Sequence, residues 1–291
     1  MIRFTGFLWF FIFGCLSAKA QVSPSFDEEI RFMQYLVSQK QYANVVLLAQ
    51  QLRPKFTTNT QQSRLAINAG MAYRRLAKPD SAALALGWVT PDFKLYDKAR
   101  FYQSLEFTRV RRYTAAHQAL DTLQLLPSDS LKHELRQFQQ AGIALLQKDY
   151  VQFEQRSRAF SFQYAAFASQ EKKLLSFAQK LKKIPQRSPL VAGILSAVVP
   201  GTGKMYAGNT SQGLSMLFQN LFMGAQAAEA LIKDGAASPR FIIYGALFSF
   251  FYIGNIWGSV LSVKMQQREV YETIRHEVLF NLDVPLRLVF Q

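Results

Sequence analysis

The sequence predicts an all-α protein, with a solenoid of helical hairpins followed by a small cluster of transmembrane helices. Three observations predict this fold class. Apolar residues recur at helical spacing from Ser25 to about Leu181, with almost no strand pattern. Short polar turns divide this region at steps of 38, 33 and 37 residues. Beyond it the chain is dominated by long apolar stretches, which are typical of membrane segments.

Charge is divided as unevenly as hydrophobicity. Residues 21–188 contain 25 Lys and Arg against 13 Asp and Glu, whereas residues 189–291 contain 7 against 6. A basic aqueous part therefore precedes a nearly neutral apolar part. We predict four parts: a signal peptide at 1–20, a helical repeat domain at 21–183, a membrane domain with two or three hydrophobic segments at 184–264, and an amphipathic C-terminal tail at 265–291.

The first twenty residues have the features of a secretory signal peptide. Arg3 gives a positive start, Phe4–Leu16 is apolar, and Ala18 and Ala20 supply a cleavage site. Lipidation at Cys15 is the less favoured alternative. After cleavage the chain would contain no cysteine, which excludes disulfides and thiolate metal sites.

The repeat region alternates amphipathic helices with short turns. The turns are expected at Gln39–Tyr42, Lys78–Ser81, Arg111–Tyr113 and Lys148–Tyr150. A period in the mid-thirties with two helices per unit is typical of a helical solenoid. Such an array presents a concave surface, so we expect it to bind a protein partner.

Several spacings resemble degenerate tetratricopeptide (TPR) units. They are Tyr35-x6-Tyr42-Ala43, Phe107-x5-Tyr113-x2-Ala116 and Leu145-x4-Tyr150, with Pro127 closing one unit. The resemblance covers about half of the chain, and it implies a TPR-like solenoid that binds other proteins.

A basic cluster directly precedes the apolar part and is expected to contact anionic lipid headgroups. An exported location makes nucleic acid a poor alternative partner. The cluster consists of Lys172, Lys173, Lys180, Lys182, Lys183 and Arg187.

Two apolar segments, Gly213–Ile232 and Phe241–Val263, are long enough to span a bilayer. A third, Pro189–Val199, is too short, so it is either re-entrant or half of a broken helix. The small-residue pairs Gly193/Ala197, Gly224/Ala228 and Gly254/Gly258 favour close helix packing within the cluster, and homo-oligomerisation is a weaker possibility.

The string around Pro-Gly-Thr-Gly-Lys is similar to a phosphate-binding loop only superficially. The required earlier glycine is replaced by Val198, and the Ser or Thr expected after the lysine is Met205. We therefore predict a tight structural turn between membrane segments. Its residues are Pro200, Gly201, Gly203, Tyr206, Gly208 and Gly213.

This turn resembles the Pro-Gly-x-Gly-x-x-Tyr-x-Gly signature of a TM2-like bacterial membrane module. A later string, Tyr252-x-Gly-Asn-Ile-Trp-Gly258, resembles a second element of that module. Lys204 departs from the pattern, in which a neutral Gln is commoner. The resemblance implies an envelope protein with a setting in envelope assembly or membrane-protein insertion.

Three polar residues lie in the apolar segments, and intramembrane polar groups are candidates for function. The structural interpretation is favoured: Asn220 and Asn255 satisfy backbone groups, and Glu229 pairs with Lys233. Our specific hypothesis is that Asn255 caps the turn. The packing glycines Gly254 and Gly258 lie beside it.

The C-terminal tail starts as an amphipathic helix with Val270, Ile274 and Val278 along one stripe. Its end, Leu286–Phe290, is expected as an edge strand or an interfacial tail. Two membrane spans would place the tail in the periplasm, and three would place it in the cytoplasm.

No catalytic pattern, cofactor motif or metal-ligand spacing is found, and His117, His133 and His276 are far apart. We therefore predict a non-enzymatic scaffold anchored in the inner membrane, with its repeats in the periplasm and a role in envelope assembly or membrane-protein biogenesis. The alternative is an accessory subunit of a transporter or exporter, in which the intramembrane polar residues form the site.

Overall fold

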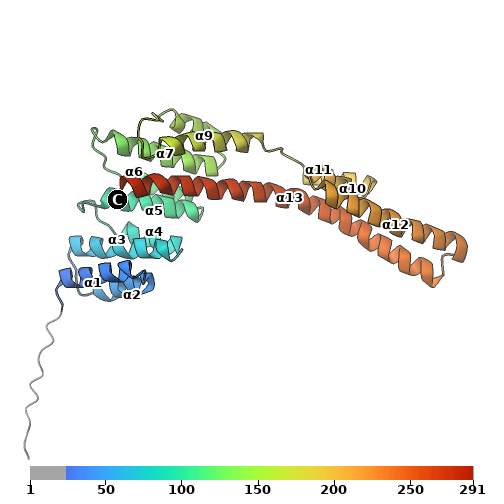
Figure 1. Cartoon of the computed structure of the whole chain (residues 1–291), viewed down its shortest axis with the longest axis horizontal. Helices are drawn as coiled ribbons and strands as arrows, with labels where there is room; N and C mark the ends of the chain where they lie inside the picture. The colour runs from blue at the N-terminus through green and yellow to red at the C-terminus, as the bar shows by residue number, and fades with distance from the viewer. Residues whose placement is uncertain (1–23, 291) are drawn as a thin grey trace, which may run out of the picture.

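A computed structural model of the chain describes residues 24–290, and the expected signal peptide and Cys15 lie outside this range. The described residues form thirteen helices and no strand (Figure 1). The helices are α1 Phe26–Ser38, α2 Tyr42–Leu52, α3 Asn59–Arg75, α4 Pro79–Gly87, α5 Tyr96–Arg109, α6 Tyr113–Asp121, α7 Ser130–Leu146, α8 Tyr150–Ser157, α9 Ala168–Lys183, α10 Pro189–Val198, α11 Thr202–Ala207, α12 Thr210–Asp234 and α13 Pro239–Val289.

The first eight helices form four hairpins that share one turn geometry. In each hairpin a non-glycine residue at the turn has a positive φ of 54° to 63°, namely Lys40, Ala77, Arg111 and Lys148. At the first turn, the Lys40 amide donates to the Val37 carbonyl at 3.0 Å and the Gln41 amide donates to the Leu36 carbonyl at 2.9 Å. This is a Schellman helix end, which satisfies carbonyls that the helix leaves free. Three of the four turns lie where the sequence predicts them. The second turn, predicted at Lys78–Ser81, lies slightly earlier, at Ala77, because α4 already begins at Pro79.

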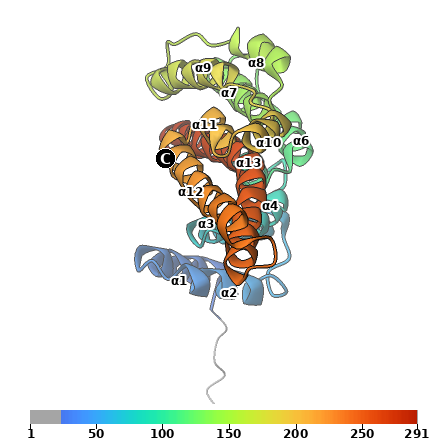
Figure 2. The ribbon, with the colours of Figure 1, turned by 90° about the vertical axis from the view of Figure 1, so that its right-hand side faces the viewer.

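The hairpins bury two apolar clusters. A smaller one joins α1, α2 and α3 around Ile30, Met33 and Leu65. The larger one runs through α3 to α9 and includes Phe101 and Phe138, which are fully buried. It also includes residues from the far end of the chain, because α13 contacts α5, α7 and α9. Figure 2 shows α13 running between the stacked hairpins.

Helix α13 is a single element of 51 residues, about 77 Å long at 1.5 Å per residue. Its first half is apolar and lies against α10, α11 and α12, whereas its second half enters the core of the hairpin stack (Figure 1). Leu282 and Leu286 are 1% and 0% exposed. The prediction of a strand or interfacial tail at residues 286–290 is therefore wrong: the helix continues to Val289 because its apolar stripe is covered by α5 and α7.

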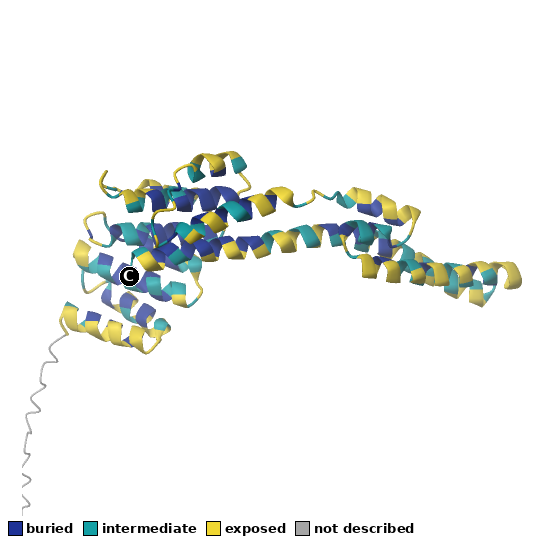
Figure 3. Cartoon of the chain, turned by 45° about the horizontal axis from the view of Figure 1, so that its top comes forward, coloured by how far each residue is buried: buried dark blue, intermediate teal, exposed yellow. Residues whose placement is uncertain are grey.

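The membrane-like part is a hairpin of α12 and α13 with two short helices beside it. The hairpin closes at Gly235, which has a φ of 87°, and Ser238 caps α13 by accepting from the Phe241 amide. Among the described helices, only α13 is both long and apolar enough to be a candidate span, with a mean hydropathy of 1.5 in its most apolar window. Figure 3 shows that this part is mostly exposed, unlike the hairpin stack.

Two buried acids hold the loop between α8 and α9. Glu134 of α7 accepts from the Ser161 amide at 2.6 Å, and Glu171 of α9 accepts from the Phe162 amide at 3.2 Å. Neither carboxyl has an ion-pair partner among the described residues. Burial, followed by the neighbouring Glu134 carboxyl, raises the pKa of Glu171 from 4.5 to about 8.

Because of this raised pKa, we expect the hairpin stack to lose stability as the pH rises. Between pH 4.5 and 8 the folded state holds a proton on Glu171 that the unfolded chain releases, so unfolding becomes easier toward pH 8. Glu171→Gln keeps a neutral acceptor and should remove this dependence, so its unfolding midpoint should exceed that of the wild type at pH 8.5 by at least about 2–4 °C. Thermal unfolding at pH 5.5 and 8.5 checks this, with Glu154→Gln as an exposed control. Parallel pH profiles for wild type and Glu171→Gln would contradict it.

Candidate functional site

The turn between α10 and α11 is packed so closely that its glycines cannot carry side chains. Gly201 has a φ of 90°, and a Cβ placed on it would lie 2.0 Å from the Gly213 carbonyl oxygen of α12. A Cβ on Gly203 would lie 1.9 Å from the Ala192 carbonyl oxygen of α10. The close packing predicted for this turn is observed, and its location between membrane segments stays a prediction. Glycine backbone contacts hold three helices together here, and Pro200 lies directly before the turn.

Serine and tyrosine hydroxyls supply the polar support of this turn. Ser196 Oγ accepts from the Gly203 amide at 2.9 Å and lies 2.7 Å from Ser259 Oγ of α13. Both serines are fully buried. The Tyr206 hydroxyl accepts from the Ser188 amide at 3.1 Å, which ties the end of α11 to the start of α10. Gly208, with a φ of 100°, then ends α11.

Our hypothesis that Asn255 caps this turn is wrong. Asn255 is 1% exposed, and neither its side-chain oxygen nor its nitrogen has a hydrogen-bond partner within the described residues. Ser196 takes the capping role: it lies seven positions before Gly203 in α10, and its hydroxyl accepts from the Gly203 amide. The sequence shows one serine in each of two separate apolar segments, Ser196 and Ser259. Their contact itself depends on how α10 packs against α13.

The polar residues Asn220 and Glu229 of α12 behave differently from each other. Asn220 of α12 donates from Nδ2 to the Met216 carbonyl at 2.8 Å, as expected, but its Oδ1 is buried without a partner. Glu229 pairs with Lys233 at 2.8 Å, which confirms the predicted ion pair. Arg240 adds a contact to Glu229 at 3.5 Å. These charges gather at the closed end of the α12–α13 hairpin.

The small-residue pairs divide into packed and open positions. A Cβ on Gly193 would lie 3.0 Å from Val260, and one on Gly224 would lie 3.1 Å from Phe248, so both sit at helix contacts. Gly258 faces the Lys204 side chain, with Cε at 3.4 Å from such a Cβ. Gly254 has nothing within 4 Å. It therefore does not mediate helix packing within this chain.

Most of the basic cluster lies on α9, which leads toward the membrane-like part (Figure 1). Lys180, Lys182 and Lys183 are in its last turn, whereas Lys172 and Lys173 lie near its start. Lys182 pairs with Glu154 at 2.5 Å. Arg187 follows in the linker, where its Nη1 donates to Gln266 of α13 at 3.2 Å. Arg187 thus fastens the linker to α13 just beyond the apolar half of that helix.

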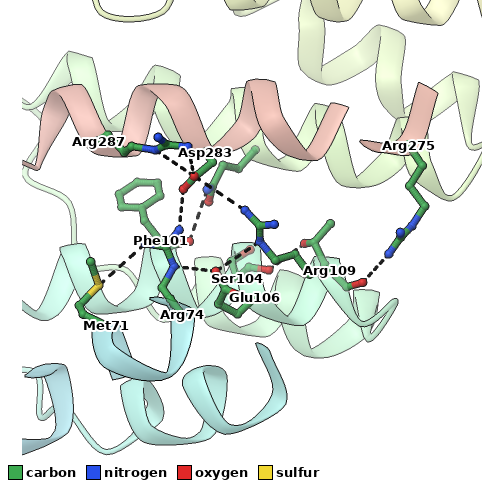
Figure 4. Close-up of polar contacts among 11 residues, drawn as sticks. Met71, Arg74, Phe101, Ser104, Glu106, Arg109, Arg275, Asp283 and Arg287 are labelled. Atoms are coloured by element: carbon green, nitrogen blue, oxygen red, sulfur yellow. Dashed lines mark hydrogen bonds and ion pairs between the residues drawn. The ribbon is translucent and has the colours of Figure 1, made fainter. Parts of the chain in front are cut away.

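A buried ionic network, which the sequence did not reveal, fixes α13 to the hairpin stack (Figure 4). Asp283 of α13 accepts from Arg74 of α3 at 2.6 Å and from Arg287 at 2.5 Å. Arg74 also contacts Glu106 of α5 at 2.6 Å. Arg109 lies 3.4 Å from Glu106 and 3.8 Å from Asp283. The side chains of Glu106 and Asp283 are only 3% and 7% exposed.

Further polar contacts extend this attachment along α13. Tyr271 donates to the Leu146 carbonyl, and Arg275 donates to the Arg109 carbonyl. Near the end of the chain, Lys98 donates to the Phe290 carbonyl at 2.6 Å. The second half of α13 is therefore an integral part of the hairpin stack. Any movement of the membrane-like hairpin would be transmitted to the hairpin stack through one continuous helix.

The described residues hold no group of three or more His, Cys, Asp or Glu placed to bind a metal ion. Comparison of the chain with protein-family models, curated proteins and solved structures found no match. The described residues form an all-helical protein, and one long apolar helix, α13, is a candidate membrane anchor.

Proposed function

We propose that this protein is a membrane-anchored scaffold that presents a helical repeat domain to a protein partner at a fixed distance from the bilayer. The observation that carries the proposal is the continuity of α13, which runs from an exposed apolar half into the core of the repeat domain. A rigid helix of this kind restrains the orientation of the attached domain, whereas a flexible linker would not.

The hairpin of α12 and α13 supports a proposal of two membrane spans. Helix α12 has 25 residues and the apolar part of α13, Pro239–Val263, has a similar length, so each reaches about 37 Å at 1.5 Å per residue. Helix α12 matches α13 in length but not in hydropathy, so its span rests on its pairing with α13. Helix α10 has 10 residues and is too short to span, which supports the re-entrant interpretation, with α11 returning toward Arg187. The C-terminus then lies on the same side as the repeats.

The outer surface of this part suits contact with lipid chains. Large apolar side chains are exposed on α10, α12 and α13, and a water-soluble surface rarely carries so many together. They include Leu190, Val198, Phe218, Leu221, Phe222, Ile232, Phe250, Ile253 and Trp257. We propose that Lys180, Lys183 and Arg187 contact anionic headgroups where α9 approaches this surface.

We further propose that the hairpin stack is a degenerate TPR-like solenoid and that the glycine turn belongs to a TM2-like module. Four hairpins with one turn geometry, spaced 34 to 37 residues apart at their positive-φ residues, support the first proposal. The glycine contacts of Gly201 and Gly203 support the second. With the expected signal peptide, these features lead us to propose a periplasmic location for the repeats and an anchor in the inner membrane. Envelope assembly or membrane-protein biogenesis is the proposed setting.

The packing of α13 restricts where a partner would bind. Helix α13 covers α5 and α7, so the face expected for a partner is occupied there by the chain itself. The hairpins α1–α2 and α3–α4 are less covered: α13 makes no comparable contact with α1, α2 or α4, and it meets α3 at the Arg74–Asp283 pair. They expose Phe32 and Tyr35 on α1, and Leu84 and Trp88 at α4. We propose this end of the stack as the partner surface.

Photo-crosslinking in membranes tests the scaffold proposal. A crosslinking residue at Tyr35 or Leu84 should give a discrete protein adduct, whereas the same residue at Val151, exposed on α8, should not. The proposal fails if no specific adduct forms at any position of α1 to α4. Solute flux through reconstituted vesicles would instead favour the transporter-subunit alternative. Within the described residues, the side-chain oxygen of Asn220 and both polar atoms of the Asn255 amide lack a hydrogen-bond partner, which supports this alternative.

A further inference from the structure

A cavity of about 400 Å³ lies where α3 and α5 meet the second half of α13. It is built around the ionic network of Figure 4, so elements from both ends of the chain form its walls. Its volume falls within the range of ordinary small-molecule sites. Arginine dominates the lining, with Arg74, Arg75, Arg109, Arg275 and Arg287.

The cavity carries more positive charge than its own acids neutralise. Glu106 and Asp283 are the two lining acids, and each is already shared by two or more arginines. Arg75 forms no ion pair among the described residues, and it is exposed at the cavity. The buried Arg275 has a Nε without a hydrogen-bond partner. Outside the lining, Glu272 pairs with Arg275 at 3.6 Å. Five arginines set against Glu106, Asp283 and Glu272 leave two formal positive charges for an added ligand.

Guanidinium groups favour oxyanions for a geometric reason. Each presents planar N–H donors in a fork that matches two oxygens of a carboxylate or phosphate. Several such forks around one cavity suit an anion that carries more than one negative group. Tyr102, Met71 and Leu279 add an apolar wall that a purely inorganic ion would leave unused.

Lipid headgroups are too distant to be the source of this anion. The cavity residue on α13 that lies nearest to the apolar half is Arg275, eleven positions beyond Lys264, where the apolar half has ended. That separation is about 17 Å along a straight helix. The ligand would therefore come from the aqueous phase.

We propose that this cavity binds a small multivalent oxyanion, bearing carboxylate or phosphate groups, that bridges the repeat helices to α13. An anion held by arginines of α3, α5 and α13 at once binds only when α13 is docked. By mass action it therefore stabilises the docked state. Anion binding to the hairpin stack would thereby strengthen the docking of α13, and through α13 the connection to the α12–α13 hairpin.

Isothermal titration of the full-length protein in detergent tests the proposal. Pyrophosphate and citrate are the two probes, and acetate at matched ionic strength corrects for general screening. We expect saturable one-site binding of at least one probe and a higher unfolding midpoint in its presence. Binding of pyrophosphate alone would identify phosphate chemistry, and binding of citrate alone would identify carboxylate chemistry. No saturable binding of either probe would overturn the proposal.

A charge reversal at Arg75 locates the binding without removing a structural contact. Arg75→Glu should weaken binding at least about tenfold, because it replaces an attractive charge with a repulsive one. Arg158→Glu, on an exposed residue at the end of α8, makes the same change in net charge away from the cavity. It should leave binding unchanged. Equal losses in the two variants, or unchanged binding in Arg75→Glu, would contradict the assignment.

Discussion

Replacing Asp283 by Ala is expected to destabilise the docking of α13 by about 3–5 kcal/mol, the usual cost of breaking a buried ion pair. The Asp283 carboxylate is 7% exposed and accepts from Arg74 and Arg287, with Arg109 at 3.8 Å. Without it, the Arg74 guanidinium, which is 13% exposed, retains only Glu106 as a counter-charge. The penalty arises from a buried positive charge that loses its compensation.

Chemical denaturation in detergent measures the loss in free energy of unfolding. Limited proteolysis, as a second assay, measures how easily α13 is released and cleaved. Asp27→Ala provides the matched control, because the Asp27 side chain is 75% exposed and its pair with Arg64 lies at the surface. Exposed pairs contribute about 0–1 kcal/mol, so the control should unfold like the wild type. If Asp283→Ala also unfolds like the wild type, the network does not hold α13 in place.

Gly201→Ala is expected to destabilise the membrane-like unit by about 2–5 kcal/mol. An L-residue at a φ of 90° is strained, and the added Cβ would lie 2.0 Å from the Gly213 carbonyl oxygen. Because that neighbour is backbone, the contact can be relieved only by separating α11 from α12, which adds an overpacking cost.

Gly254→Ala is the control that isolates packing from general effects of altering a glycine. Nothing lies within 4 Å of a Cβ at Gly254, which is in the middle of a helix. Alanine is the better helix former there, by about 1 kcal/mol, so this variant should be at least as stable as the wild type. The folded fraction in size-exclusion chromatography, together with the thermal midpoint in detergent, distinguishes the two. A tolerated Gly201→Ala would show that the turn is not closely packed.

The features that the sequence predicted are those set by local chemistry. Turn positions such as Lys40 and Lys148 follow from a short polar break between two helical patterns. The close packing at Gly201 and Gly203 follows from glycines within an apolar segment, where a side chain would otherwise be favoured. The pair of Glu229 with Lys233 follows from their spacing of one helical turn.

The features that the sequence did not predict depend on contacts between distant residues. Asp283 lies 209 positions from Arg74, and nothing in its neighbours indicates that α13 returns to the repeats. The sequence predicts the apolar stripe of Ile274 and Val278, but it does not indicate that α5, α7 and α9 cover this part of α13. Asn255 was assigned as a cap because it is polar, whereas Ser196 and Ser259 meet only once α10 and α13 are packed.

We propose that the α12–α13 hairpin crosses the membrane and returns, so the hairpin stack and the second half of α13 lie on one side. Single cysteines in a Cys15→Ser background test it directly, since Cys15 is the chain's one cysteine. An impermeant maleimide applied to intact cells and to inverted vesicles should label Gln39→Cys and Glu277→Cys from the same side, and Ser238→Cys from the opposite side. Labelling of Gln39→Cys and Glu277→Cys from opposite sides, or of all three from one side, would contradict the account.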